Sequence, residues 1–387
     1  MKVLYIALGG KGGSDKALVD LLSELVKYDL DPLVVCGRPD LTVELGKIGI
    51  KSIIYDFTWA INPPCRSIKD KILYFPRQIK CFLRRKVDVI NLKKVVKDFA
   101  PDLISTNVGV VRLGYNLGKK MGVPHVWHIR EYQDQDHGMH PVKGMNYYRK
   151  LLKKNKFNIA ITKGLYQYFR MCSPAVQIYD GVRKRRSAVA LRPHVPQKYF
   201  VFAGFLFQGK GLEELLHAYK SYSEQGGHHE LYILGTWSEN NPFHRWVKQY
   251  IDDNGLKGAK LLGFRNDVDE LMSHSSAVIV ASKFEGFGRV ACEGMFNKTL
   301  VIGKNTAGTK EQFDNLDDYI GKKVSFRYQT EAELVERMFE VENISSELRF
   351  EIVEKSFEIV NRLYSSETSA SQVYEYYNAV LKLYNHK

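Results

Sequence analysis

The sequence is short of cysteine, and its few cysteines are not paired. The chain of 387 residues has five of them, and none forms a Cys-x-x-Cys pair. A disulfide framework and a zinc site of clustered cysteines are therefore not indicated. A reducing, cytoplasmic environment fits this pattern best.

Long apolar runs are missing as well. No stretch of the sequence approaches the ~20 apolar residues that are needed to span a bilayer. The apolar start, Met1 to Leu8, is shorter than the core of a signal peptide and lacks its cleavage pattern. We expect this start to form a strand, and the protein to be either soluble in the cytoplasm or peripheral on the inner face of the plasma membrane.

The chain also lacks the signatures of ATP-binding and NAD-binding loops. The glycine-rich segment Gly9 to Gly13 has no Gly-x-x-x-x-Gly-Lys-Ser/Thr pattern, and Asp15 stands where the third glycine of Gly-x-Gly-x-x-Gly belongs. ATPase and NAD-dependent activities thereby lose most of their support. The segment follows an apolar strand, so its backbone can approach a ligand, and a plain flexible turn is the alternative.

Acidic residues are scarce in the first half of the chain. Residues 1–200 contain 36 Lys and Arg against 16 Asp and Glu, whereas residues 201–387 contain 21 against 27. We expect the first half to meet something anionic. Its most basic stretch, Arg66 to Asp98, interleaves 11 Lys and Arg with apolar side chains. This pattern favours an anionic membrane surface as a partner, or a surface helix pair that is broken at Pro76 and packs its apolar face in the core.

What the chain does have is a repeated alternation of apolar strands and amphipathic helices. Strands are expected at 3–8, 32–36, 52–55, 103–106, 125–128 and 158–162, and then at 199–203, 230–234, 260–262, 277–281 and 300–302. The alternation predicts an α/β fold with parallel sheets covered on both faces. We expect a first domain at 1–184, a basic, proline-bearing linker at 185–198, a second domain at 199–368 and a C-terminal helix at 369–387.

Two glutamates bracket a glycine-rich turn in the second half. Glu285 and Glu293 stand eight residues apart, with Gly286 and Gly288 between them. A continuous helix would leave the two carboxylates about 80° apart, so we place Glu285 in a loop and begin the helix near residues 288–290. The helix N-terminus then favours an anionic diphosphate between two acids that accept hydrogen bonds from hydroxyls. The pattern predicts a nucleotide-sugar site, and the alternative is a helix cap with a solvated glutamate.

Other charged side chains follow predicted strands. Lys210 stands in a glycine turn that begins at Gly204 and can place a point charge on a phosphate, unless it is merely solvated. His128 and Arg130 end a strand of the first half and can face a ligand there. Three Asp-x-Asp matches lie outside any glycine-rich loop, so we predict no essential metal, and no cofactor.

In this order the segments resemble glycosyltransferase family 4, whose members have two Rossmann-like domains facing each other across a cleft, the GT-B fold, and transfer sugars with retention of configuration. The resemblance covers nearly the whole chain. It runs through the Gly12–Gly13 loop, 177–182, 204–211, Gly235, 261–264, 285–293 and the Gly308 loop.

The resemblance implies roles for matching positions. Glu285 would bind the donor sugar and steady its positive charge, Glu293 would hold the ribose, and His128 or Arg130 would lie beside the acceptor and sugar. The remaining donor-binding positions are Lys210, Gly204, Phe264, Gly286, Phe287, Gly288, Arg289, Val290, Gly12 and Gly13. Family members commonly have an arginine where this chain has Phe205. The family's final helix crosses back to the first domain.

The implied activity is that of a hexosyltransferase. It would move a sugar from a UDP- or GDP-linked donor to a glycan or lipid-linked acceptor in bacterial surface polysaccharide synthesis, with no nucleic-acid partner. Two other classes stay open. A glycoside hydrolase could use the paired glutamates, and a nucleic-acid binder could use the basic first half, although it would leave the Glu285 segment unexplained.

Overall fold

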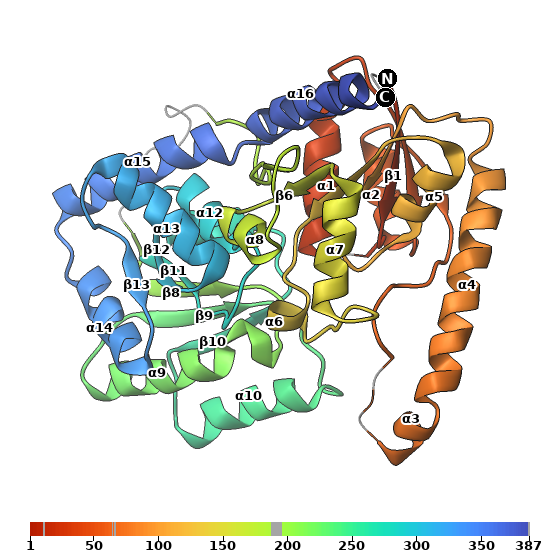
Figure 1. The fold of residues 1–387 in the computed structure, drawn as a ribbon. Coiled ribbons are helices and arrows are strands. Elements are labelled where there is room, and N and C mark those ends of the chain that lie inside the picture. The colour runs from red at the N-terminus through yellow and green to blue at the C-terminus, as the bar shows by residue number, and fades with distance from the viewer. Residues whose placement is uncertain (11, 64, 66, 187–195, 386–387) are drawn as a thin grey trace. The chain divides into compact units, whose positions relative to one another are not determined.

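The structure, a computed structural model, describes residues 1–10, 12–63, 65, 67–186 and 196–385. The chain divides into two compact units (Figure 1). Unit 1 comprises Met1–Gly181 and Ser366–Lys387, and unit 2 comprises Val182–Ser365. Most of the expected linker, residues 187–195, lies outside the described residues, and the described residues 182–186 belong to unit 2.

Unit 1 is built on a parallel sheet of seven strands in the order β3-β2-β1-β4-β5-β6-β7. The strands are β1 (Lys2–Ala7), β2 (Asp31–Cys36), β3 (Lys51–Ile54), β4 (Leu103–Thr106), β5 (His125–Ile129), β6 (Asn158–Ala160) and β7 (Val176–Gln177). Their side chains alternate between two core clusters. Val3 and Tyr5 point to one cluster, and Leu4 and Ile6 point to the other, as the two-residue period of a strand requires.

Helices cover both faces of this sheet. They are α1 (Gly13–Leu25), α2 (Asp40–Lys47), α3 (Ile68–Ile72), α4 (Tyr74–Val95), α5 (Leu113–Met121), α6 (Asp134–His137), α7 (Met145–Asn155), α8 (Lys163–Tyr168) and α16 (Ser366–Asn385). Helices α1 and α16 pack on one face, and α4 and α5 pack on the other. The break between α3 and α4 falls at Leu73, and Pro76 lies in the first turn of α4, where a missing N–H costs little.

The last helix, α16, is part of unit 1. Its apolar stripe buries Val373, Tyr376, Tyr377 and Val380 in the same cluster as β1. The Tyr377 hydroxyl donates a hydrogen bond of 2.9 Å to Ser105 Oγ on β4, so the buried phenol is satisfied.

Unit 2 has a parallel sheet of six strands in the order β10-β9-β8-β11-β12-β13. The strands are β8 (Tyr199–Ala203), β9 (Glu230–Leu234), β10 (Ala259–Gly263), β11 (Ala277–Val280), β12 (Leu300–Lys304) and β13 (Phe326–Tyr328). The helices are α9 (Leu212–Glu224), α10 (Pro242–Asp253), α11 (Val268–His274), α12 (Arg289–Phe296), α13 (Ala307–Ile320), α14 (Glu331–Glu342) and α15 (Ser346–Leu363), and Gln208–Lys210 forms a short 3-10 turn, η2.

The predicted α/β class with two parallel-sheet domains is confirmed. All of the expected strands are present, and β7 and β13 were not predicted. Both sheets follow the Rossmann order, in which the chain reverses its direction of growth between the first and fourth strands. That reversal, the switch point, lies between β1 and β4 in unit 1 and between β8 and β11 in unit 2. Ligands of such sheets bind beyond the carboxyl ends of the strands at this point.

Within the described part of the chain, no helix is long and apolar enough to cross a membrane.

Candidate functional site

The loops that follow β8 and β11 meet at the switch point of unit 2. The carboxylate of Glu285 accepts a hydrogen bond of 2.5 Å from Lys210 Nζ and one of 2.6 Å from Ser282 Oγ. The two charged side chains are half-buried, at 17% exposed for Glu285 and 25% for Lys210. Two residues that lie 75 positions apart in the sequence thus form one ion pair where a ligand of this fold is expected.

Glycine at position 211 allows these two loops to touch. Gly211 has φ +73°, and a Cβ at this position would lie 1.8 Å from the carbonyl oxygen of Ala281. The Lys283 N–H also donates to the Gly209 carbonyl at 3.1 Å. Only a glycine tolerates both the left-handed backbone and this close approach, so the local sequence fixes Lys210 beside the β11 loop.

Helix α13 supports the loop from the other side. The Gly308 N–H donates to the Glu285 carbonyl at 2.9 Å, and Gln312 Nε2 donates to the Phe287 carbonyl at 2.5 Å. A Cβ on Gly308 would lie 2.4 Å from the Phe287 carbonyl oxygen. The Gly308 loop, one of the segments that carry the family resemblance, therefore holds the backbone of the glutamate loop.

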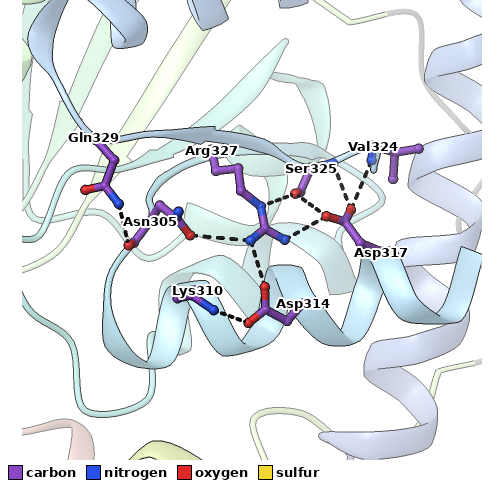
Figure 2. A network of polar contacts seen from close by, with 8 residues as sticks. All are labelled: Asn305, Lys310, Asp314, Asp317, Val324, Ser325, Arg327 and Gln329. Atoms are coloured by element: carbon purple, nitrogen blue, oxygen red, sulfur yellow. Dashed lines mark hydrogen bonds and ion pairs between the residues drawn. The ribbon is translucent and has the colours of Figure 1, made fainter. Parts of the chain in front are cut away.

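A polar network holds α13 in turn. Figure 2 shows Arg327 of β13 between Asp314 and Asp317 of α13, with ion-pair distances of 2.7 Å to each. Asp317 also accepts from the backbone N–H groups of Val324 and Ser325 at 3.0 and 3.1 Å. The network ties α13 to the edge of the sheet and so fixes the helix that carries Gly308.

Helix α12 begins at Arg289, within the predicted range, and points its N-terminus at this loop. Its N-cap is Gly288, with φ +86°, which brings no side-chain cap. The start of a helix carries about half a positive charge. The backbone from Phe287 to Val290, to which the resemblance assigns the diphosphate, thus includes a helix start whose N-cap glycine supplies no capping side chain.

Glu293, the second glutamate of the motif, lies in the second turn of α12 and is buried. Its Oε1 lies 3.5 Å from Arg183 Nη1, and Arg183 also pairs with Asp269 at 2.8 Å. Sequence reasoning missed Arg183, which it placed in the first domain. The basic cluster Arg183 to Arg186 was the available signal, but the sequence analysis gave it no role in a site.

Aromatic side chains stand exposed beside the same strand ends. Phe264, which follows β10, is 72% exposed, and Phe205, which follows Gly204 at the end of β8, is 54% exposed. Gly204 has φ +151°, a backbone conformation that favours glycine. Phe205 thus presents a ring where relatives of the resembled family commonly have an arginine.

The predicted residues of the first half gather in unit 1. Arg130 forms an ion pair with Asp180, its Nε donates to Asn107 Oδ1 at 3.1 Å, and its Nη2 lies 3.3 Å from His128 Nδ1. All four side chains are buried. Burial and the neighbouring guanidinium lower the pKa of His128 well below its ordinary value, so its ring is neutral. Asp180 was quoted in the sequence only as part of 177–182, without a role.

A second buried acid follows directly. Glu131 accepts a 2.5 Å hydrogen bond from the Gly109 N–H. Burial, with a smaller contribution from Asp136, raises the pKa of Glu131 to about 8. Gln133 nearby has φ +72°, an uncommon backbone conformation for a residue other than glycine.

The glycine-rich loop of unit 1 is closed by its own helix. Asp15 accepts from the Gly9 and Gly10 N–H groups at 3.2 and 3.0 Å, and burial raises the pKa of its carboxyl. Gly12 is the N-cap of α1, which begins at Gly13 and has no side-chain cap. The N–H groups of Gly9 and Gly10 are therefore used internally, whereas Gly12 and Gly13 form the start of α1, as expected of a ligand-binding loop.

The described residues include no group of three or more His, Cys, Asp or Glu side chains that could hold a metal ion.

Comparison with known proteins adds a family likeness to this geometry. Residues 184–356, which carry the Lys210 and Glu285 loops, match the family model described as glycosyl transferases group 1. An uncharacterized glycosyltransferase of Methanocaldococcus jannaschii is 23% identical over 225 residues, a match that covers 57% of this chain and 60% of that relative. The matched part of the chain thus spans less than two thirds of the relative's length.

Solved structures are similar over nearly the whole chain. Anabaena HepE in complex with UDP has a TM-score of 0.75 at 19% identity and covers 98% of this chain and 100% of its own. A glycosyltransferase from Rickettsia africae has a TM-score of 0.76 at 18% identity, with 98% of both chains covered. Sucrose-phosphate synthase from Thermosynechococcus elongatus has a TM-score of 0.74 at 15% identity, and the match covers 99% of this chain and 100% of the synthase chain. The predicted fold, two Rossmann-like domains of the GT-B type, is confirmed.

Proposed function

We propose that this protein is a retaining glycosyltransferase of family 4 that moves a hexose from a UDP- or GDP-linked donor to a glycan or lipid-linked acceptor in bacterial surface polysaccharide synthesis. The observation that carries the proposal is the Lys210–Glu285 pair at the switch point of unit 2. The match of residues 184–356 to group 1 glycosyl transferases and the UDP bound in Anabaena HepE support it.

Lys210 and the start of α12 are proposed to bind the donor diphosphate. A diphosphate placed there competes with Glu285 for the ammonium group of Lys210, because both are anionic partners within its reach. When Lys210 turns to the phosphate, Glu285 keeps its hydrogen bond from Ser282 and gains free acceptor positions for sugar hydroxyls. The ion pair thus holds Lys210 and Glu285 in position before the donor binds.

The ribose and the base of the donor are proposed to bind to residues of the same unit. Glu293 is proposed to accept hydrogen bonds from the ribose hydroxyls, with Arg183 beside it as a fixed counter-charge. Phe264 is exposed and suits a stacking contact with the base. Phe205 cannot bind phosphate as an arginine would, so the diphosphate depends more heavily on Lys210 and the helix start.

Unit 1 is proposed to serve the acceptor. His128 is neutral and can accept or donate a hydrogen bond without a charge of its own, and Arg130 fixes its ring. The final helix, α16, completes the core of this unit. A lipid-linked acceptor would bring the enzyme to the inner face of the plasma membrane as a peripheral protein.

The chemistry is proposed to take place on one face of the sugar. The acceptor hydroxyl oxygen bonds to the anomeric carbon while the bond from that carbon to the diphosphate oxygen breaks. The nucleotide diphosphate leaves with the electron pair, and one of its phosphate oxygens takes the hydroxyl proton. Glu285 stabilises the positive charge on the sugar, and Lys210 with the α12 start stabilises the leaving charge. No metal is assigned a role.

A thermal-shift screen against UDP, GDP and ADP and their sugars tests the proposal, because a ligand that binds only the folded state stabilises it. We expect UDP or GDP to raise the melting temperature of the wild type. The shift should be lost in Lys210→Ala and kept in Lys257→Ala, an exposed lysine of the same unit. Failure of all three nucleotides to shift the wild type would overturn the proposal. Free sugar released from a glycoside without any nucleotide would instead identify a hydrolase.

A further inference from the structure

Helix α4 has two apolar sides, and only one of them lies in the core. Val89 and Leu92 are buried against the sheet of unit 1. Ile79, Leu83 and Ile90 lie on the side of α4 opposite Leu92, and Phe75 and Phe82 are exposed beside them in the N-terminal half of the helix. Together with the last residue of α3 they form what we call the outer face: Ile72, Phe75, Ile79, Phe82, Leu83 and Ile90. Phe75 is 75% exposed and Ile79 is 61% exposed.

The segment from α3 to the end of α4, which carries the outer face, is rich in exposed apolar side chains. Nineteen large hydrophobic side chains of the described residues are exposed, and nine of them lie between Ile68 and Val95. Single exposed apolar residues are normal, whereas a contiguous group marks an interaction surface. Figure 1 shows α3 and α4 at the margin of unit 1, with α3 continuing beyond one end of α4.

Positive charge surrounds this apolar surface. The same segment, Ile68 to Val95, holds nine Lys and Arg against two Asp. Both acids are already engaged. Asp70 pairs with Arg77, and the buried Asp88 accepts from the Thr58 N–H at 3.0 Å. Arg77 and Arg84 are paired with acids, Arg84 with the exposed Asp56 outside the segment, and the remaining charge of the segment is basic.

The combination of exposed apolar side chains and positive charge favours one binding partner for the outer face. A second copy of the chain would bring the same positive charges against the face, and like charges across an interface are costly. An anionic lipid surface matches both parts, because the apolar side chains enter the boundary of the acyl chains while lysines contact the headgroups. The 22 residues of α4 extend about 33 Å at 1.5 Å per residue and can lie in the plane of a bilayer.

We propose that the outer face of α3–α4 docks unit 1 onto an anionic bilayer surface. The inference deepens the proposed function, since it places the enzyme at the surface where a lipid-linked acceptor would reside. It is tested without donor, acceptor or turnover. Loss of transfer activity and loss of lipid binding can therefore be told apart.

Vesicle flotation of the full chain is the test, with vesicles of phosphatidylcholine alone and of phosphatidylcholine with an equal part of phosphatidylglycerol. We expect the wild type to float with the anionic vesicles only, and less so at high salt. The variant Ile79→Ser with Leu83→Ser should lose at least tenfold in partitioning, because two apolar anchors are removed. The control is Val43→Ser with Leu383→Ser, two equally exposed apolar residues elsewhere in unit 1, and should float as the wild type.

Charge is tested separately with Lys80→Gln and Lys94→Gln, both exposed on α4. Each replacement should weaken binding about fivefold, the value of one basic side chain near an anionic surface. Lys150→Gln with Lys154→Gln on α7 is the matched control. Flotation that is absent, or equal on neutral vesicles, would overturn the proposal. So would concentration-dependent self-association that the Ile79→Ser and Leu83→Ser changes abolish, since it would identify a second copy as the occupant.

Discussion

The two units share one strand order but differ in how they treat the polar groups at their switch points. In unit 1, Asp15, Asn107 and Arg130 are each less than 7% exposed. Asp15 accepts from the Gly9 N–H, and Asn107 donates to the Ser14 carbonyl. Arg130 donates to Asn107 and pairs with Asp180. In unit 2, Glu285 and Lys210 are 17% and 25% exposed and pair chiefly with each other. The same architecture thus carries a buried polar network in one unit and a more accessible ion pair in the other.

The difference shows which groups are available to a ligand. A buried hydrogen-bonded network fixes the shape of the unit, because the removal of one member leaves its partners unpaired in a medium of low dielectric. A half-buried pair beside a helix N-terminus can exchange a partner at little cost, because water and the helix start compensate for the change. We therefore expect stability to depend on the unit 1 network and donor chemistry on the unit 2 pair.

Removal of one charge from each unit should separate these roles most strongly. Arg130→Met leaves Asp180 buried without its counter-charge and should lower the free energy of unfolding by about 3–5 kcal/mol. Lys210→Met opens a partly exposed pair beside a helix start and should cost about 1 kcal/mol or less. Thermal and urea unfolding of both variants measure the contrast.

The double variant Arg130→Met with Asp180→Leu is the control for the buried charge. It should recover part of the loss of Arg130→Met, because no unpaired carboxylate remains. Equal destabilisation by Arg130→Met and Lys210→Met would contradict the contrast between the two units.

The next effect concerns activity in unit 2. Glu285→Gln keeps the size of the side chain and an oxygen that can accept from Ser282, but removes the negative charge. If the proposed role is right, the turnover number should fall about a hundredfold or more, while the thermal shift produced by the nucleotide persists. Glu224→Gln, at the end of α9, should leave turnover unchanged. An active Glu285→Gln enzyme would remove this carboxylate from the mechanism.

The sequence was most informative where structure depends on local pattern. Short apolar runs predicted the strands at the two switch points, and the glycines around Glu285 predicted a helix start that the structure places at Arg289. The very short strands β7 and β13 carry too few residues for a two-residue period to be visible. Their place in the sheet comes from the strands beside them.

Contacts between segments far apart in the sequence could not be predicted from local patterns. Asp180 lies 50 residues from Arg130, and Arg183 lies 110 residues from Glu293, so nothing local links the partners. Helix α4 shows a further limit. Its apolar side chains occupy two faces, and only the packed structure shows that Leu92 faces the core while Phe75 faces solvent.

The last expected effect is a pH dependence of stability that should arise in unit 1. The folded-state pKa of Glu131 is raised to about 8 by burial, above its ordinary 4.5. Between these values the folded state binds a proton that the unfolded state has lost, so the free energy of unfolding should fall as pH rises, by at most about 1.4 kcal/mol per pH unit, and level off outside that window. Glu131→Gln mimics the neutral acid and should remove this slope. Melting temperatures at about pH 5 and about pH 8 measure it, and parallel changes in the wild type and Glu131→Gln would show that Glu131 is ionised in the folded state.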